Sequence, residues 1–261
     1  MFINGNRDNK KINPEKAQKD AGTANIILEG ILRQLGRVSQ SSREVSWQKA
    51  RENYREILTS LAPTYQAKKG SVAYQINDLN LDAFTGGDEH ILISVDDTSD
   101  SSEEIPYTSR IYKITHSECF GCKVLFDPED TELSGKHFHA QGNYDPWLYL
   151  KRWQLLNSIS SYTTRFEAII APEQPNWPPR ICISQPYIPG EPPSQTIITE
   201  AFMKFNFHPV SLGAYYSHER DILLTDAFPR NVRIWQGAPV PFDAIAINPN
   251  AEMKTWLHAR I

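Results

Sequence analysis

Apolar residues near the start of the chain recur at steps of three and four, which is the period of an amphipathic helix. One stripe follows the helix-start signal NPE at residues 13–15 and ends at Gly36, and a second covers residues 47–61 and ends before Pro63. The first stripe consists of Ile26, Ile27, Ile31, Leu32 and Leu35. The pattern predicts a helical hairpin behind a polar leader of residues 1–12, with a packing or partner-binding role.

From residue 73 onward, the pattern changes to short apolar runs that are typical of strands, and an acidic stretch, DDTSDSSEEIPYT, separates the first two of them. Strands are predicted at 90–95, 109–115, 166–171 and 180–188. Helical spacing returns twice, and helices are predicted at 147–159, after Asp145 and Pro146, and around 196–207. The order of elements predicts an α+β chain.

Near the C-terminus, residues 223–245 read LLTDAFPRNVRIWQGAPVPFDAI. The segments LLTD and VPFDAI predict two short strands on either side of the glycine turn WQGAP, each with a polar residue at its edge. The proline-rich segment from Pro186 to Pro193 precedes this region and predicts a hinge between two lobes.

Composition limits the classes of function. The chain has 261 residues, 40% of them hydrophobic, and a net charge of −4, so no basic surface suggests bulk nucleic-acid binding. No apolar run is long enough for a membrane helix, and the N-terminus does not resemble a signal peptide. Three cysteines do not make a disulfide framework, which favours a reducing, cytoplasmic location.

Three polar residues in the 223–245 segment have a spacing with chemical meaning. Asn231 follows Asp226 by five positions, and Asp243 follows Asn231 by twelve. Protein kinases use this spacing for a carboxylate that orients the acceptor hydroxyl and for an amide and a carboxylate that hold magnesium. Oxygen ligands of this kind suit a hard cation. Asp226 is therefore the candidate catalytic residue, and Asn231 and Asp243 are the candidate metal ligands.

The N-terminal half supplies further parts in the same order. Gly86 and Gly87 precede a predicted strand, where a backbone without side chains can cover phosphates. Lys113 lies within the apolar strand SRIYKIT, with Ile111 on the same face. A lysine in such a strand needs an anionic partner, and bound phosphates would provide one. Singly, the glycines could equally form a hairpin turn and the lysine could reach solvent from an edge strand.

Taken together, the segments GGDEHILI, IYKIT, PWLYLKRWQLLN, ISQPYIPGEPP, LLTDAFPRNVRI and VPFDAIA resemble the kinase domains of bacterial polyvalent proteins, which are associated with phages and conjugative elements. The resemblance covers residues 73–247. It implies a two-lobed protein-kinase-like fold with a shortened C-terminal lobe, and ATP and Mg²⁺ as ligands. The implied division is a leader and helical hairpin at 1–66, an N-lobe at 73–188 and a C-lobe at 189–261.

The same resemblance implies a role for each candidate residue. Lys113 would contact phosphates, beneath a phosphate-covering turn at Gly86 and Gly87. The segment Gln185–Ile188 would be the hinge against adenine, with Gln185, Tyr187 and Ile188 as the nucleotide-binding residues. Asp226 would be the catalytic aspartate, and Asn231 and Asp243 would bind the metal. The acceptor of the phosphoryl group is not implied, and the N-terminal hairpin could bind a protein partner.

The chain also departs from the kinase pattern. Leu224 and Thr225 stand where kinases have His-Arg, and Ala244 replaces the glycine after the metal-binding aspartate. The helix at 147–159 contains no glutamate to pair with Lys113. Asp145, Glu132 and Glu118 are the alternative acids. Only 18 residues follow Asp243, so the usual activation segment and peptide-binding helices are missing. An active kinase and an inactive, nucleotide-binding interaction module both remain open.

A zinc site is a separate alternative. His116, Cys119 and Cys122 have knuckle-like spacing, and His137 and His139 would place both rings on one face of a strand. Against zinc, the chain has no second Cys pair, and the segment ECFGCK also fits a turn after the lysine strand. Ordinary loop residues are the preferred interpretation.

Overall fold

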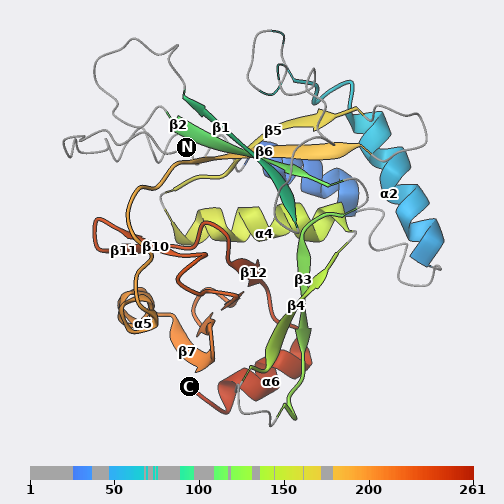
Figure 1. Cartoon of the computed structure of the whole chain (residues 1–261). Helices are drawn as coiled ribbons and strands as arrows, with labels where there is room; N and C mark the ends of the chain where they lie inside the picture. Colours follow the sequence, from blue (N-terminus) through green and yellow to red (C-terminus); the bar gives the residue numbers. More distant parts are fainter. Residues whose placement is uncertain are drawn as a thin grey trace.

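The computed structural model describes residues 26–36, 47–67, 69, 73, 75, 89–96, 109–116, 119–130, 136–143, 145–160, 162–171 and 179–261. Within these ranges the chain is a mixed α+β protein with several antiparallel sheets, as the sequence predicted (Figure 1). The predicted polar leader, Gly86 and Gly87 lie outside the described residues. No helix in the described ranges is both long and apolar enough to cross a membrane.

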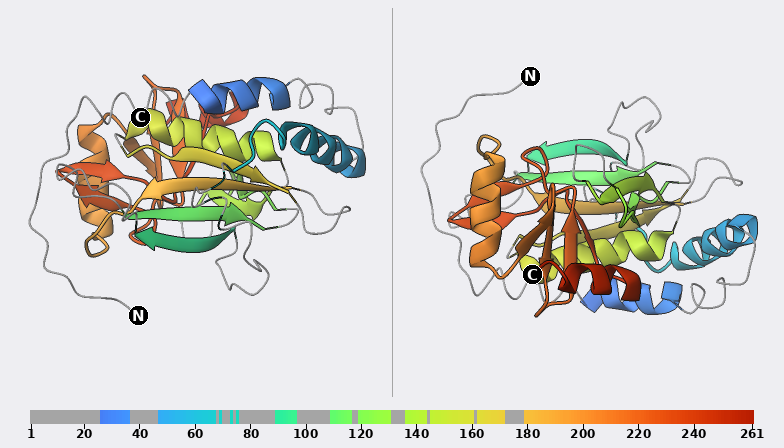
Figure 2. Two further views of the ribbon diagram at one scale, coloured as in Figure 1. Left: turned by 90° about the horizontal axis from the view of Figure 1, so that it is seen from above. Right: turned by 90° about the horizontal axis from the view of Figure 1, so that it is seen from below.

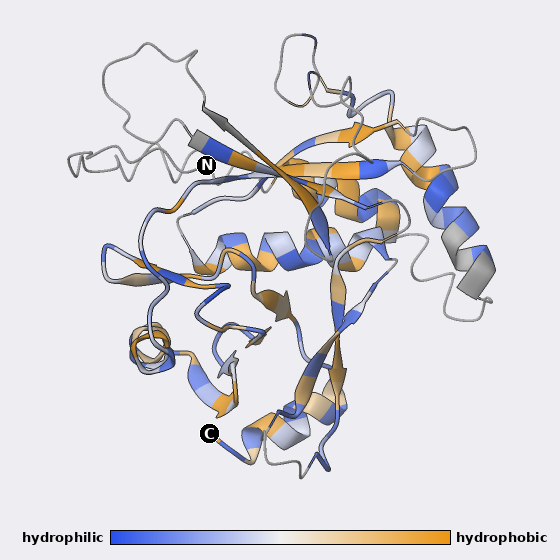
Figure 3. Cartoon of the chain, viewed as in Figure 1, coloured by the Kyte–Doolittle hydropathy of each residue, from blue (hydrophilic) through white to orange (hydrophobic). Residues whose placement is uncertain are grey.

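Four of the described strands form an N-terminal antiparallel sheet in the order β1-β2-β6-β5. They are β1 (His90–Asp96), β2 (Ser109–Thr115), β5 (Arg165–Ile170) and β6 (Arg180–Pro186), which confirms the four predicted strands. Lys113 lies opposite Leu92 and Ile183, so the three side chains share one face. Ile114 and Cys182 point to the other face, into a smaller cluster that includes Ala73. The hydrophobic colouring of this sheet is visible in Figure 3.

Helix α4 (Pro146–Ile159) lies against the N-terminal sheet (Figures 1 and 2). Asp145 caps its first turn by accepting bonds from the backbone N–H groups of Trp147 and Leu148, and Pro146 fits the first helical position. Leu150 and Trp153 are fully buried in the main hydrophobic core. Tyr149, Leu155 and Leu156 of the same helix also belong to this core, so α4 is buried on more than one face.

The two N-terminal helices pack into that same core. The first is described over residues 26–36 and the second, α2, covers Trp47–Leu61, both within predicted helices. The predicted start of the first helix at residues 13–15 lies outside the described residues. The buried positions of the first helix are Leu28, Ile31, Leu32 and Leu35. Ile26 and Ile27, which the sequence placed on the apolar stripe, are exposed, because Leu28 occupies the face that turns toward α4. The division at residue 66 stays a prediction.

A second sheet follows in the C-terminal part, in the order β12-β9-β8-β7 among the described strands. Its strands are β7 (His208–Ser211), β8 (Ala214–Ser217), β9 (Ile222–Thr225) and β12 (Ile245–Ile247). Helix α5 (Gln195–Lys204) precedes it, as predicted, and α6 (Ala251–His258) follows it.

The strands of the 223–245 segment are arranged differently from the prediction. Leu223, Leu224 and Thr225 belong to β9 and Asp226 follows it, but VPFDAI is not one strand: β11 (Ala238–Val240) ends within it and β12 begins at Ile245. The turn WQGAP closes a separate hairpin of β10 (Arg233–Trp235) and β11, with Gln236 and Gly237 both at positive φ. β9 and β12 pair directly with each other. The long connection between paired strands therefore carries the polar residues.

A hairpin that the sequence did not predict connects β2 to α4. Its strands are β3 (Cys122–Phe126) and β4 (Phe138–Gly142), and it extends from the N-terminal sheet to α6 (Figure 1). Phe126 and Phe138 stack on each other at 5.2 Å between ring centroids, and both contact Trp256 of α6 edge-on. Apolar packing thus fixes the far end of this hairpin against the C-terminal part of the chain.

Candidate functional site

The two charged residues predicted to share a site are in direct contact. The Nζ atom of Lys113 on β2 lies 2.7 Å from Oδ1 of Asp243, in the loop before β12, and donates to the carbonyl of Phe242 at 3.1 Å. The Lys113 side chain is 5% exposed, and its amine also lies over the Trp153 ring. A buried amine requires such partners. The lysine is therefore held between the sheet, α4 and the Asp243 loop.

A second cation, which the sequence analysis did not identify, holds the same loop. Arg152 of α4 donates through Nε to the Ala244 carbonyl at 2.9 Å and through Nη2 to the Asp243 carbonyl at 2.6 Å. Its Nη1 donates to Oε2 of Glu89 at 2.8 Å, immediately before β1. The helix therefore carries an arginine in this network, and the acid, Glu89, lies at the start of the sheet. The sequence signal for Arg152 was weak, because it is one of the polar residues Lys151, Arg152 and Gln154 in this helix.

Burial and the two cations shift the pKa values of Asp243 and Glu89 in opposite directions. Burial alone would raise the pKa of Asp243, but Lys113 and Arg152 outweigh it and lower this pKa to about 2. The pKa of Glu89 is also lowered, because Arg152 and then His90 outweigh the burial that would raise it. Burial lowers the pKa of Lys113, and the contact with Asp243 opposes that change. The network contains two carboxylates and two cations, which makes it electrically balanced.

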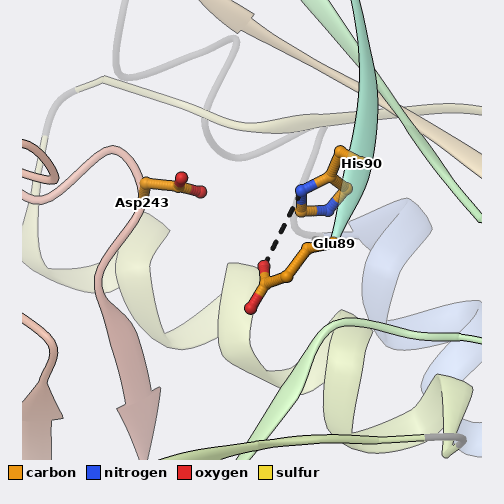
Figure 4. Close-up of side chains that lie close together, drawn as sticks. All are labelled: Glu89, His90 and Asp243. Atoms are coloured by element: carbon orange, nitrogen blue, oxygen red, sulfur yellow. Dashed lines mark ion pairs between the residues drawn. The ribbon is translucent and has the colours of Figure 1, made fainter. Parts of the chain in front are cut away.

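His90 completes this cluster (Figure 4). Burial and then the neighbouring Lys113 charge lower its pKa to about 3, so the ring is neutral near pH 7, and its Nε2 pairs with the Tyr149 hydroxyl at 3.0 Å. Ligand atoms of Glu89, His90 and Asp243 lie within 4.8 Å of one another, the one such group among the described residues. A metal among all three would have to compete with Lys113 and Arg152, which already bind its two carboxylates.

Asp226 and Asn231 form a compact loop after β9. Asp226 has a positive φ of 53°, which is uncommon for a residue other than glycine. The Asn231 amide donates to the Asp226 carboxylate oxygen Oδ2 at 2.7 Å and to the Asp226 carbonyl at 2.8 Å. Burial raises the pKa of Asp226, and the cations of Arg230 and Lys136 oppose that rise. Internal bonds hold the carboxylate in a fixed direction.

The loop is also joined to the Lys113 network. The backbone N–H of Asp243 donates to the Asn231 carbonyl at 3.2 Å. The structure therefore connects Lys113 to Asp243 and Asp243 to Asn231 by direct contacts. Asp226 joins this group through its hydrogen bond with Asn231.

The predicted hinge lines a pocket next to this cluster. A small hollow is bordered by Gln185, Pro186 and Ile188 and by Val240, Pro241 and Phe242. Its enclosed volume of about 10 Å³ is close to that of a single water site, so it is much smaller than a small-molecule pocket. The Gln185 side chain is buried and donates to Oγ1 of Thr164 at 2.9 Å. Tyr187 is exposed and is not part of the lining.

Of the three alternative acids for Lys113, the structure describes only Asp145. Asp145 does not pair with Lys113, because its carboxylate caps α4 at 2.8 Å from the Trp147 nitrogen. Glu118 and Glu132 lie outside the described residues. The direct partner is Asp243, and Glu89 acts on Lys113 from a greater distance.

The residues of the zinc alternative do not converge. In the register of the hairpin, Cys122 is opposite Gly142, whereas His139 is opposite Leu125, three positions farther along. His139 pairs with Asp130 at 3.2 Å, and His137 bonds to the Asp127 carbonyl. Burial and a bond with Glu89 raise the pKa of the Cys122 thiol, which disfavours the thiolate that zinc requires. Within the described ranges, these Cys and His residues form no metal-binding group.

Comparisons with known proteins place this chain in no group: no family model, no curated protein and no solved structure matches it.

Proposed function

We propose that this chain is an ATP- and Mg²⁺-dependent phosphotransferase with a two-lobed, kinase-like architecture. The observation that carries the proposal is the contact of Lys113 with Asp243 at 2.7 Å, made between an N-terminal strand and a loop 130 positions later. Phosphoryl transfer relies on positioning and on neutralising phosphate charge, and a lysine beside a metal-binding carboxylate supplies both.

The donor atoms fit a magnesium ion. Asn231 offers an amide oxygen and Asp243 a carboxylate, both hard ligands, and a backbone hydrogen bond keeps the two residues adjacent. Asp243 is 37% exposed, so it can turn from Lys113 toward an entering nucleotide. Bound magnesium would neutralise charge on the phosphates. Lys113 would then contact the phosphates, and the small hollow beside Pro186 and Ile188 would have to widen to hold the adenine ring.

The order of elements supports the same proposal. A sheet and a helix precede the segment Pro186–Pro193, and the Asp226 loop, the β10–β11 hairpin and Asp243 follow it. The proposed resemblance to the kinase domains of polyvalent proteins rests on this order and on the residues already described. Arg152 and Glu89 take over the positioning that a helix glutamate performs elsewhere.

A titration of the full chain with ATP and MgCl₂ tests the proposal. A ligand at 100 times its Kd should raise the free energy of unfolding by about 2.7 kcal/mol, which a thermal shift detects. Asp243→Asn should lose the part of this effect that depends on Mg²⁺, and Lys204→Gln, on the exposed end of α5, should behave as wild type. The absence of a shift with every nucleoside triphosphate and metal would rule out the proposed function.

A nucleotide-binding module without turnover is the second candidate, and one observation favours it. Both oxygens of the Asp226 carboxylate already accept hydrogen bonds within the protein, Oδ1 from Arg230 and Oδ2 from Asn231. A comparison of ATP turnover with that of Asp226→Asn separates the two candidates. A wild-type rate of ATP turnover above that of Asp226→Asn supports the enzyme, and equal rates in the two proteins support the module.

A further inference from the structure

Two cations flank the Asp226 carboxylate and share one aromatic ring. Arg230 donates through Nη2 to Oδ1 of Asp226 at 2.7 Å, and its guanidinium lies 5.2 Å from the centroid of Phe228. The amine of Lys136 lies 5.6 Å from the same centroid. Neither cation belongs to the Lys113 network. The ring can hold both beside the carboxylate through cation–π attraction.

These groups come from three separate segments that pack together. Phe228 fits against Gly213 in the β7–β8 turn, where an added Cβ would lie 2.5 Å from the ring atom Cζ. The backbone of His137 donates to Oγ of Ser211 at 3.2 Å, which fastens the β3–β4 hairpin to β7. Lys136 immediately precedes His137. The hairpin thus brings Lys136, which precedes α4 in the chain, to the ring of Phe228 beside the Asp226 loop.

The hydrogen bonds of Asp226 impose a condition on any acceptor. Oδ2 is bound by Asn231, which has little exposure, whereas Oδ1 is bound by Arg230, whose side chain is 69% exposed. An acceptor hydroxyl would therefore approach Oδ1, which as a carboxylate oxygen can accept a second hydrogen bond beside that of Arg230. The exposed Arg230 guanidinium then lies next to the acceptor. Exposed ion pairs are weak, so Arg230 can also bind an anion that the acceptor supplies.

We propose that Lys136 and Arg230 form an anion-binding site beside Asp226 and that the phosphoryl acceptor carries a carboxylate or phosphate close to its hydroxyl group. This inference rests on the proposed function. The anion binds Arg230 and Lys136 while the hydroxyl binds Oδ1 of Asp226. In the transfer, the hydroxyl oxygen bonds to the γ-phosphorus of ATP, the bond from that phosphorus to the β–γ bridging oxygen breaks, ADP leaves, and the hydroxyl proton passes to Asp226.

Calorimetric titration of the full chain with matched probes tests this site without any need for turnover. Glycerol 3-phosphate is compared with glycerol, and a peptide with glutamates on both sides of a serine is compared with its glutamine analogue. We expect at least one anionic probe to bind at least tenfold more tightly than its neutral counterpart, and to bind more weakly as salt is added. The probe that binds shows whether the anion belongs to a small molecule or to an acidic peptide.

Variants assign the binding to the two cations. Arg230→Gln and Lys136→Gln should each weaken the anionic probe about tenfold, because each removes a charge-assisted bond. Lys204→Gln removes the same charge on α5 and should change nothing. Equal binding of anionic and neutral probes, or unchanged binding in the double variant, would overturn the inference. A loss of ATP affinity without loss of ADP affinity in Arg230→Gln would also overturn it, since the cations would then serve the γ-phosphate.

The nucleotide and anion titrations of the same protein distinguish a failure of this inference from a failure of the proposed function. A chain that binds ATP with Mg²⁺ but shows no preference for anionic probes refutes the acceptor site alone. A chain that binds the anionic probe through Arg230 but binds no nucleotide refutes the phosphotransferase and leaves the anion site in place.

Discussion

Arg152 donates to the backbone carbonyl of Asp243 at 2.6 Å, so a helix side chain fixes the main chain of the loop that carries the candidate metal ligand. The same guanidinium binds the Ala244 carbonyl and the Glu89 carboxylate. A side chain that is 3% exposed and satisfied on three sides couples α4, the start of β1 and the loop before β12. The geometry of the whole site depends on this one residue.

Replacement of this residue should therefore be costly. Arg152→Met should lower the free energy of unfolding by about 3–5 kcal/mol, because it leaves Glu89 without its closest cation and two carbonyls without donors. Urea unfolding measures the change. Arg220→Met, at an exposed arginine, should stay within about 0.5 kcal/mol of wild type. The double variant Arg152→Met, Glu89→Gln should lose less than the sum of the single changes, and strict additivity would contradict the proposed pairing.

The neutral, buried His90 predicts a specific pH dependence. Its pKa is about 3 in the folded chain and near 6.5 when unfolded, so the unfolded state binds the proton first as pH falls. The stability that His90 contributes is fully present above pH 6.5 and is lost between pH 6.5 and 3, with a slope of up to about 1.4 kcal/mol per pH unit. His90→Gln, which can still bond to Tyr149, should flatten this slope. Unfolding measured from pH 7 to 5 tests it, and identical slopes would refute the assignment.

Gly213 should be essential for the position of Phe228. Gly213→Ala adds a Cβ that meets the ring at 2.5 Å, in addition to the strain of a φ of 67°. Gly237 has a comparable φ of 78° and no atom within 4 Å of such a Cβ, so Gly237→Ala carries the backbone strain alone. We expect Gly213→Ala to be more destabilising than Gly237→Ala by about 1–3 kcal/mol. The double variant Gly213→Ala, Phe228→Leu should recover part of that difference, because leucine is smaller than phenylalanine. If Gly213→Ala and Gly237→Ala are equally destabilising, the Phe228 ring moves freely and the prediction is wrong.

Asp226 and Asp243 should differ in what they contribute to nucleotide use. Asp226→Asn should keep ATP affinity near that of wild type and abolish turnover, because the residue faces the acceptor. Asp243→Asn should weaken ATP binding in the presence of Mg²⁺ and lose turnover as well. Calorimetry and a coupled ADP assay, each repeated with EDTA, measure the two effects. A nucleotide affinity in Asp243→Asn that still responds to Mg²⁺ would place the metal elsewhere.

Local patterns in the sequence determined most of the regular elements. Strands β1, β2, β5 and β6 and helices α2, α4 and α5 were predictable, because a period of two or 3.6 and a capping signal such as Asp145-Pro146 act over a few neighbouring residues. The hairpin β3–β4 was missed, since β3 alternates only between partly buried and exposed positions, most of β4 is exposed, and the apolar contacts of the hairpin lie on α6. The division of the 223–245 segment failed for a similar reason: β9 pairs with β12 across an intervening hairpin.

The sequence by itself also determined which residue types could meet phosphates and a metal, through the spacing of Asp226, Asn231 and Asp243 and a lysine in an apolar strand. Only the tertiary structure decided their partners. It paired Lys113 with Asp243, assigned Asp145 to a helix cap and introduced Arg152 with Glu89, and it brought Lys136 and Arg230 to the same aromatic ring, Phe228. The physical reason is that a buried charge is stabilised by whichever opposite charge the packing brings near, and packing joins positions far apart in the chain.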